Sequence, residues 1–279
     1  MTWRISVRHT TGYRYSQPVR ASYNEARMTP LTVSGQQTLE ARLELTPHVR
    51  ALQYTDYWGS KVHAFDVHVP HTELIVTATS VVETAGVREA GTEVSWEWIR
   101  SERLLDRFSE LLAPSRYVVA EAEVTAHAIE MSAAQTPADA GRLAATWAHE
   151  QLSYERGSTG VHTTSDVARA AGKGVCQDYA HLTLAALRAM GLPARYVSGY
   201  LCPESTIMGV STVGESHAWV EYWAGSWTPV DPTSLQDVAD RHVVVARGRD
   251  YADVRPLSGI YHGPPAGALG VTVELTRLR

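Results

Sequence analysis

The sequence predicts an α+β protein in two parts, an antiparallel β-sandwich followed by helices that pack on a second antiparallel sheet. Apolar and polar residues alternate over much of residues 1–85, which indicates strands with one buried and one solvated face. Runs rich in Ala and Leu follow between residues 102 and 190, and aromatic and β-branched runs return after residue 194. We therefore expect two domains, residues 1–90 and 91–279, the second with a C-terminal β extension.

Three stretches of the first part carry the strand pattern. Residues 39–45 alternate apolar and charged side chains without a break, and residues 62–69 and 73–82 repeat the theme. Residues 86–91 are small and polar, which is typical of a linker or a hairpin end. These strands predict the sandwich.

Three helices are predicted ahead of the first reactive residue. Residues 102–112 carry apolar side chains near the 3.6-residue period, and residues 121–131 form a second candidate. The third runs from Thr136, a favourable cap, through Pro137 in the first turn to about residue 152.

Cys176 lies at the start of a fourth predicted helix. Residues 177–190 are rich in Ala and Leu and contain no Gly or Pro, and Gly191 and Pro193 end the helix. Unpaired N–H groups and the positive end of the helix dipole favour the thiolate over the thiol at this position. The same N–H groups would hold the oxyanion of a tetrahedral intermediate. By itself the position also suits a small buried hydrophobe, the usual role of a free cysteine.

A histidine and an aspartate follow on a predicted β-hairpin. Residues 216–223 read as a strand, and a three-residue turn leads into a return strand. If Trp223 faces Trp227 across that turn, Asp231 becomes the diagonal neighbour of His217 on the same face. A shift of one residue would move Asp231 to the other face, and the turn does not fix the register. A thiol, an imidazole and a carboxylate together supply a nucleophile, a base and an orienting acid.

The residues around these three side chains form separated blocks that occur together in one known family. The blocks are residues 174–181, 191–200, 216–221 and 230–233. An N-terminal part that runs from residues 13–16 to residues 56–59 precedes them, and residues 248–256 follow them. Together they resemble the bacterial transglutaminase-like cysteine protease family. The resemblance implies an N-terminal all-β domain followed by a papain-like, transglutaminase-like core. It also implies that Cys176 is the nucleophile, His217 the base and Asp231 the orienting acid.

Three functions of different classes fit these residues. The preferred one is a cysteine-dependent hydrolase of peptide or other amide bonds, in which an acyl-enzyme forms on Cys176 and water attacks it with His217 as base. A transglutaminase or other acyl transferase would share these steps and use an amine acceptor. Hydrolysis is favoured because water needs no second binding site. The third is a non-catalytic binding protein on the same fold, or a zinc site built from Cys176, His217 and Asp231, whose long separations are a weak zinc signal.

Four further residues are candidates for the substrate site: Tyr154, Gln177, Ser216 and Trp219. Tyr154 opens a Gly-containing segment that suggests a loop near the cleft, although a packing role is the favoured interpretation for this tyrosine. Trp219 belongs to a tryptophan cluster beside His217, for which packing is the simpler role. Residues 203–214, rich in Ser, Thr and Gly, predict a loop that flanks the cleft and influences substrate access.

Composition argues against several partners. The net charge of −5 gives no electrostatic reason to expect nucleic acid or an anionic membrane. No stretch approaches the roughly 20 apolar residues of a membrane span, and the first residues lack a signal-peptide core. The two cysteines, Cys176 and Cys202, suit free thiols in a reducing cytoplasm. No cofactor is expected, and His63, His68 and His71 lack metal-ligand spacing.

Overall fold

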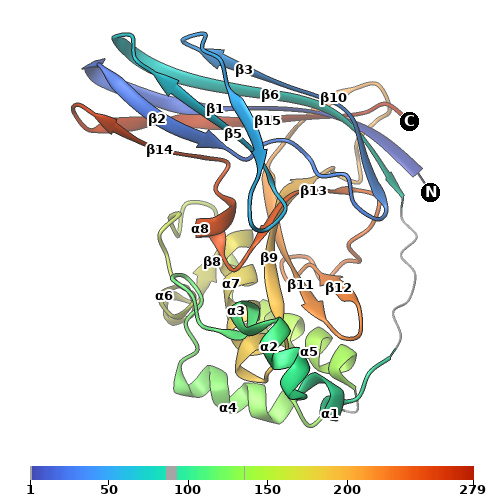
Figure 1. Ribbon diagram of the computed structural model, residues 1–279. Helices are drawn as coiled ribbons and strands as arrows, with labels where there is room; N and C mark the ends of the chain where they lie inside the picture. The colour runs from blue at the N-terminus through green and yellow to red at the C-terminus, as the bar shows by residue number, and fades with distance from the viewer. Residues whose placement is uncertain (1, 86–92, 135) are drawn as a thin grey trace.

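A computed structural model describes residues 2–85, 93–134 and 136–279. The predicted linker at residues 86–91 and the predicted boundary at residue 90 therefore lie outside the described residues. Three larger antiparallel sheets and one short parallel pair carry the fold, with the sandwich at one end and the helices at the other (Figure 1). This arrangement confirms the predicted α+β class.

The sandwich consists of a five-stranded and a four-stranded sheet. The first has the order β10-β15-β1-β6-β3 and the second the order β14-β2-β5-β4. Their strands are β1 (Thr2–Val19), β2 (Ala21–Ala26), β3 (Gln36–Thr46), β4 (Leu52–Thr55), β5 (Lys61–Val67), β6 (His71–Ala85), β10 (Ser211–Gly214), β14 (Leu257–His262) and β15 (Ala266–Arg277). Buried side chains of both sheets, such as Phe65 of β5 and Leu74 of β6, meet in one apolar cluster. The predicted sandwich is thereby confirmed.

Strand β3 only partly follows the burial pattern that the alternation at residues 39–45 predicts. Leu45 is buried and Leu43 half-buried, but Leu39 is 41% exposed. Strand β3 is the edge of its sheet, and its register shifts between Thr38 and Glu40. Leu39 is the extra residue at this shift, since Thr38 and Glu40 pair with the adjacent residues Val82 and Val81, and the alternation breaks there.

Helix α7 (Cys176–Ala189) is the centre of the second part. It packs on the sheet formed by β12 (Trp227–Val230), β11 (Ser216–Trp223), β9 (Ala194–Leu201) and β13 (His242–Gly248), in that order. Helices α4 (Ala122–Met131), α5 (Pro137–Gln151) and α6 (Ser165–Ala171) surround it. Residues 177–188 are all buried, so the helix has no solvated face over this stretch.

The predicted helix at residues 102–112 is interrupted. It forms α2 (Glu102–Arg107) and α3 (Ser109–Leu112), after the short α1 (Trp96–Ile99). Phe108 leaves helical geometry between them, with φ −118° and ψ 21°. Its ring packs on Trp223 and Trp227 of the hairpin, with centroids 5.1 and 5.5 Å apart. Tertiary packing therefore overrides the local helical period. The cap and first turn predicted for α5 are present, since Thr136 accepts a hydrogen bond from the Asp139 N–H.

Strands from the second half of the chain complete the sheets of the first half. Strand β15 lies between β1 and β10 in the five-stranded sheet, and β14 pairs with β2. The segment predicted as a loop at residues 203–214 thus ends in strand β10, because Ser211 to Gly214 pair with β15. Helix α8 (Tyr251–Val254) links β13 to β14, and its Tyr251 N–H donates to His181 of α7.

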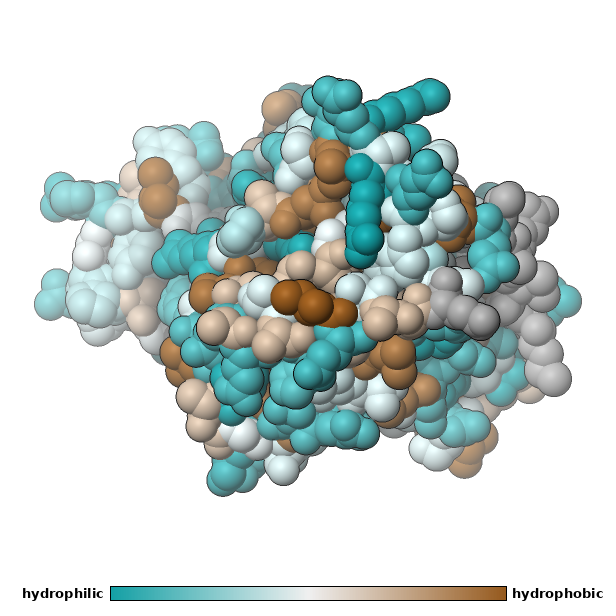
Figure 2. All heavy atoms as spheres, turned by 90° about the horizontal axis from the view of Figure 1, so that it is seen from below, coloured by the Kyte–Doolittle hydropathy of each residue, from teal (hydrophilic) through white to brown (hydrophobic). Residues whose placement is uncertain are grey.

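The helical end shows mixed surface chemistry. On this face apolar side chains lie in small groups among hydrophilic ones (Figure 2). Within the part of the chain that the structure describes, no helix combines the length and the apolar character needed to cross a membrane.

Candidate active site

Cys176 is the first residue of α7 and is partly exposed. The extended residue Val175 precedes it, and the parallel pair β7 (Ser153–Tyr154) and β8 (Lys173–Gly174) holds the approaching chain. At this place the N–H groups of Cys176 and Gln177 have no intrahelical acceptor, whereas the Asp178 N–H donates to the Val175 carbonyl at 2.8 Å. The thiol and free backbone donors are therefore presented together, as the sequence predicted.

Asp178 fixes the turn that presents Cys176. Its Oδ2 accepts from the Val175 N–H at 2.8 Å and from the Thr159 hydroxyl at 2.6 Å. Gly174 is required beside it, because a Cβ there would come within 2.7 Å of the Asp178 Cβ. Burial raises the pKa of Asp178, while these hydrogen bonds oppose the rise. The carboxyl group ties the Cys176 loop to the segment after Tyr154.

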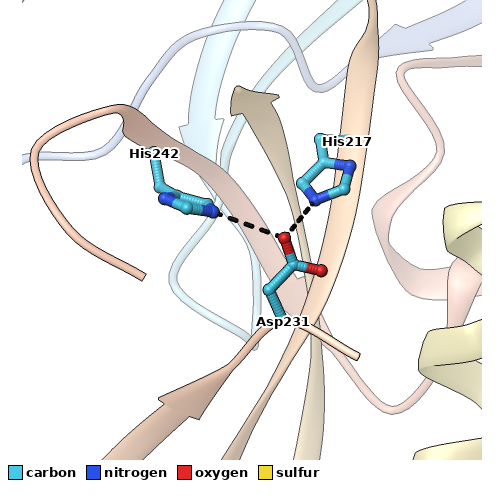
Figure 3. A group of neighbouring side chains, drawn as sticks. All are labelled: His217, Asp231 and His242. Carbon is cyan, nitrogen blue, oxygen red and sulfur yellow. Dashed lines mark hydrogen bonds and ion pairs between the residues drawn. The ribbon is translucent and has the colours of Figure 1, made fainter. Parts of the chain in front are cut away.

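The hairpin has the register that places His217 beside Asp231. Trp223 pairs with Trp227 and Val220 with Val230. Figure 3 shows His217 pointing at Asp231, and His217 Nε2 lies 2.9 Å from Asp231 Oδ2. Since Nε2 is engaged there, Nδ1 is the nitrogen left for Cys176, which is close enough to His217 to raise the pKa of the ring. The structure brings the three predicted residues together.

The electrostatics of His217 favour its protonated form. Burial by itself lowers the pKa of His217, but the hydrogen bonds and charges of Asp231 and Cys176 raise it to about 10. At neutral pH the ring is then an imidazolium between a carboxylate and a thiolate. In this charge state a cysteine nucleophile is ready to react.

Asp231 is fully buried and well supplied with donors. Its Oδ1 accepts from the Thr233 N–H at 2.9 Å, and its Oδ2 accepts from the Ser234 hydroxyl at 2.8 Å. Burial would raise the pKa of Asp231, but contacts with His217, His242 and Ser234 hold it well below its usual range. The carboxylate is thus a stable negative charge behind the imidazole.

His242 is a residue of this site that sequence reasoning missed. Its Nε2 lies 3.6 Å from Asp231 Oδ2. It begins strand β13 eleven residues after Asp231, and no local spacing links the two. Only the pairing of β13 with β9, whose other neighbour is β11, brings His242 to the same carboxylate.

Three side chains here meet the geometry of a metal site. Ligand atoms of His217, Asp231 and His242 lie within 4.8 Å of one another. However, Nδ1 of His242 accepts a hydrogen bond from the Ala239 N–H at 3.3 Å. A neutral imidazole that binds a metal through Nε2 must carry its proton on Nδ1, where that N–H would oppose it. The arrangement suits proton donation to Asp231 better than metal binding.

Comparison with known proteins places the chain in a family. Residues 5–83 match the bacterial transglutaminase-like N-terminal region, and residues 125–232 match the transglutaminase-like superfamily. An uncharacterised protein of Mycobacterium leprae is 45% identical over 277 residues, which is 99% of each chain. The chain belongs to the bacterial transglutaminase-like family.

Other relatives of this transglutaminase-like protein differ in coverage. An uncharacterised protein of Mycobacterium tuberculosis is 33% identical and covers 98% of this chain and 93% of its own. A protein-glutamine gamma-glutamyltransferase of Pseudomonas aeruginosa is 32% identical over 159 residues, 52% of this chain and 23% of that protein. The structure of a candidate cysteine protease from Cytophaga hutchinsonii shares the fold, with a TM-score of 0.80, 21% identity, and coverage of 100% and 92%.

The four candidate substrate-site residues of this transglutaminase-like chain separate into two kinds. Tyr154 is 47% exposed and close enough to Cys176 for the thiolate charge to act with burial in raising the pKa of Tyr154. Ser216 is exposed beside His217, whereas Gln177 is buried. Trp219 is completely buried and stacks on His217, with ring centroids 6.1 Å apart. Tyr154 and Ser216 thus face the surface, and Trp219 packs beneath the imidazole.

An ion pair connects the segment after Tyr154 to the segment before Ser216. Arg156, two residues after Tyr154, lies 2.8 Å from Glu215, the residue before Ser216. Both side chains are more than half exposed. Such a pair contributes little to stability in water, but in this transglutaminase-like protein it joins the segment after Tyr154 to the residue that precedes strand β11.

Proposed function

We propose that this protein is a cysteine-dependent hydrolase of peptide or other amide bonds. The observation that carries the proposal is the placement of His217 between the buried Asp231 carboxylate and Cys176 at the N-terminus of α7. This geometry is the Cys-His-Asp arrangement of nucleophilic catalysis on carbonyl carbon.

The proposed reaction proceeds through an acyl-enzyme. The Cys176 thiolate attacks the amide carbonyl, and the first backbone N–H groups of α7 stabilise the oxyanion. Protonated His217 donates its proton to the leaving nitrogen, the C–N bond breaks, and the amine departs. Neutral His217 then accepts a proton from water as that water attacks the thioester, and the acid and the free thiolate form. Asp231 remains ionised throughout.

Acyl transfer to an amine is the second candidate. It is favoured by the similarity to the Pseudomonas aeruginosa protein-glutamine gamma-glutamyltransferase in the half of the chain that carries the triad. The two reactions share the acyl-enzyme and differ only in the nucleophile that reaches it. The exposed residues Tyr154 and Ser216 would flank either acceptor.

A product assay tests the proposal and separates the two reactions. Peptides that contain glutamine are incubated with the protein, with and without a fluorescent primary amine, and the products are identified by mass spectrometry. We expect cleaved or deamidated peptide in both incubations, and no turnover by Cys176→Ala. Amine-linked peptide as the main product would instead support transfer. Turnover that persists in Cys176→Ala would contradict both mechanisms.

The same variant should keep its fold. Cys176 is partly exposed, so we expect Cys176→Ala to change the free energy of unfolding by less than about 1 kcal/mol. Urea denaturation provides this control. Loss of turnover can then be assigned to the missing sulfur.

A further inference from the structure

A second imidazole approaches the carboxylate that orients the proposed base. In Figure 3 His217 and His242 lie on different sides of Asp231, and both point at its Oδ2. They come from strands β11 and β13, the two neighbours of β9. The distances to Oδ2 are 2.9 Å from His217 Nε2 and 3.6 Å from His242 Nε2.

Local hydrogen bonding determines which nitrogen of His242 carries the proton. The Ala239 N–H donates to Nδ1, so Nδ1 must offer a lone pair and the proton must lie on Nε2. This Nε2 is buried and has no hydrogen-bond partner within 3.5 Å among the described residues. Burial lowers the pKa of His242, although Asp231 opposes this. The result is a neutral N–H donor aimed at a buried carboxylate.

Packing holds His242 in this orientation. The Trp219 ring packs edge to face against the His242 ring, with centroids 5.3 Å apart. The same indole stacks on His217. Gly199 makes this possible, because a Cβ there would lie 2.6 Å from the Trp219 ring. The two histidines are therefore fixed against one indole.

We infer that His242 is a positioning residue that keeps Asp231 aimed at His217 and thereby sets the reactivity of Cys176. At 3.6 Å the contact is longer than a hydrogen bond, and contacts of this kind shorten when the reacting state forms. His242 acts through Asp231 and does not touch the substrate. The inference rests on the proposed function, because it presumes that Cys176 and His217 form an activated pair.

Two substitutions separate the contact with Asp231 from the contact with Ala239. In His242→Asn the amide oxygen replaces Nδ1 and still accepts from Ala239, but the side chain is too short to reach Asp231. In His242→Gln the amide nitrogen lies near the original Nε2 and restores the donor. His71→Asn is the matched control, because His71 is another buried histidine with an unpartnered Nε2, in the sandwich.

The measurement is the rate of iodoacetamide alkylation at Cys176, followed by mass spectrometry at pH 7 on variants shown to be folded by circular dichroism. We expect His242→Asn to slow alkylation about fivefold to tenfold, the rate equivalent of one hydrogen bond. His242→Gln should stay within about twofold of the unchanged protein, as should His71→Asn. Equal slowing in the Asn and Gln variants would mean a merely structural role and would overturn the inference.

His217→Ala separates the failure of this inference from the failure of the proposed function. We expect it to slow alkylation by about tenfold or more, since the imidazolium is lost. If His217→Ala is slow while His242→Asn reacts normally, the inference is wrong and the activated pair stands. If His217→Ala reacts normally, the activated pair itself is wrong.

Nitrogen NMR of the unchanged protein tests the inference without any variant. With histidine labelled in its ring nitrogens, we expect His242 to be neutral with its proton on Nε2. A neutral ring with the proton on Nδ1 would leave Asp231 without this donor and would overturn the inference even if His242→Asn does not fold.

Discussion

The buried carboxylate of Asp231 is the residue on which the charge state of the site depends. It has no exposed surface, and its negative charge is retained because nearby N–H and O–H donors offset its burial. The charge in turn helps to keep His217 protonated. A change at Asp231 should therefore alter the reactivity of Cys176 through His217, without a direct contact between Asp231 and Cys176.

Substitution of Asp231 by Asn tests this dependence. The amide has nearly the same shape but no charge, so the pKa of His217 should fall from about 10, and the imidazolium should be lost at lower pH. We expect turnover to fall by about three to four orders of magnitude, as for other triads in which the acid is replaced by its amide. The pH profile of Cys176 alkylation should also change, with slower alkylation at and below neutral pH, because less imidazolium is present to stabilise the thiolate.

Ser234→Ala is the control for that experiment, because it removes a neutral donor from the same carboxylate. It should alter the alkylation profile far less. An unchanged profile in Asp231→Asn would show that the carboxylate does not govern His217.

At the scale of helices and strands, the sequence predicted those features that depend on residues close to one another in the chain. The start of α7 and its end at Gly191 follow from residues close in sequence, whereas the turn left the register that pairs Trp223 with Trp227 open. His242 and strand β10 could not be predicted, because their roles depend on β13 pairing with β9 and on β15 pairing with β10. The break at Phe108 likewise depends on tryptophans more than 100 residues away.

The sheet that carries His217 is pinned by a buried ion cluster on Glu221. This carboxylate of β11 is 1% exposed and accepts from Arg195 of β9 at 2.7 Å and from Arg247 of β13 at 3.0 Å. Three adjacent strands are thus joined by one side chain. Burial would raise the pKa of Glu221, but the two guanidinium groups lower it.

Glu221→Gln should destabilise the protein by about 3 kcal/mol at pH 7, because it leaves two arginines without their buried counter-charge. A depressed folded pKa means that the stabilisation is complete above the unfolded pKa, about 4.5, and is lost as the pH falls towards the folded value. The gap in free energy of unfolding between the two proteins should therefore narrow below about pH 4.5.

Urea denaturation at pH 7 and pH 4 measures that gap. Glu44→Gln makes the same chemical change at an exposed ion pair with Arg42 and should cost less than about 1 kcal/mol. A gap that widens at low pH would be inconsistent with an ionised Glu221.

At the scale of the whole molecule, part of the five-stranded sheet shares a buried cluster with the helical core. Trp3 and Ile5 of β1 and Leu275 of β15 belong to the same buried cluster as Leu184 of α7. Strand β10 of the sandwich leads through a single residue into β11, which carries His217. The chain should consequently unfold as one cooperative unit.

Leu275→Ala tests this coupling from the sandwich side. Leu275 is fully buried and packs closely against Gly214 of β10, where an added Cβ would lie 2.7 Å from the Leu275 side chain. Its truncation should lower the free energy of unfolding by about 2 to 5 kcal/mol. Val271→Ala on the same strand should have a much smaller effect, since Val271 is 59% exposed.

Two probes of the Leu275→Ala protein decide whether the coupling is real. Far-ultraviolet circular dichroism reports all strands and helices, and alkylation of Cys202, which is fully buried, reports opening of the core. Because one buried cluster joins both parts, we expect both probes to give the same urea midpoint, shifted together from that of the unchanged protein. A circular dichroism transition that precedes Cys202 exposure would show that the sandwich unfolds alone, and the reactivity of Cys176 would then not depend on it.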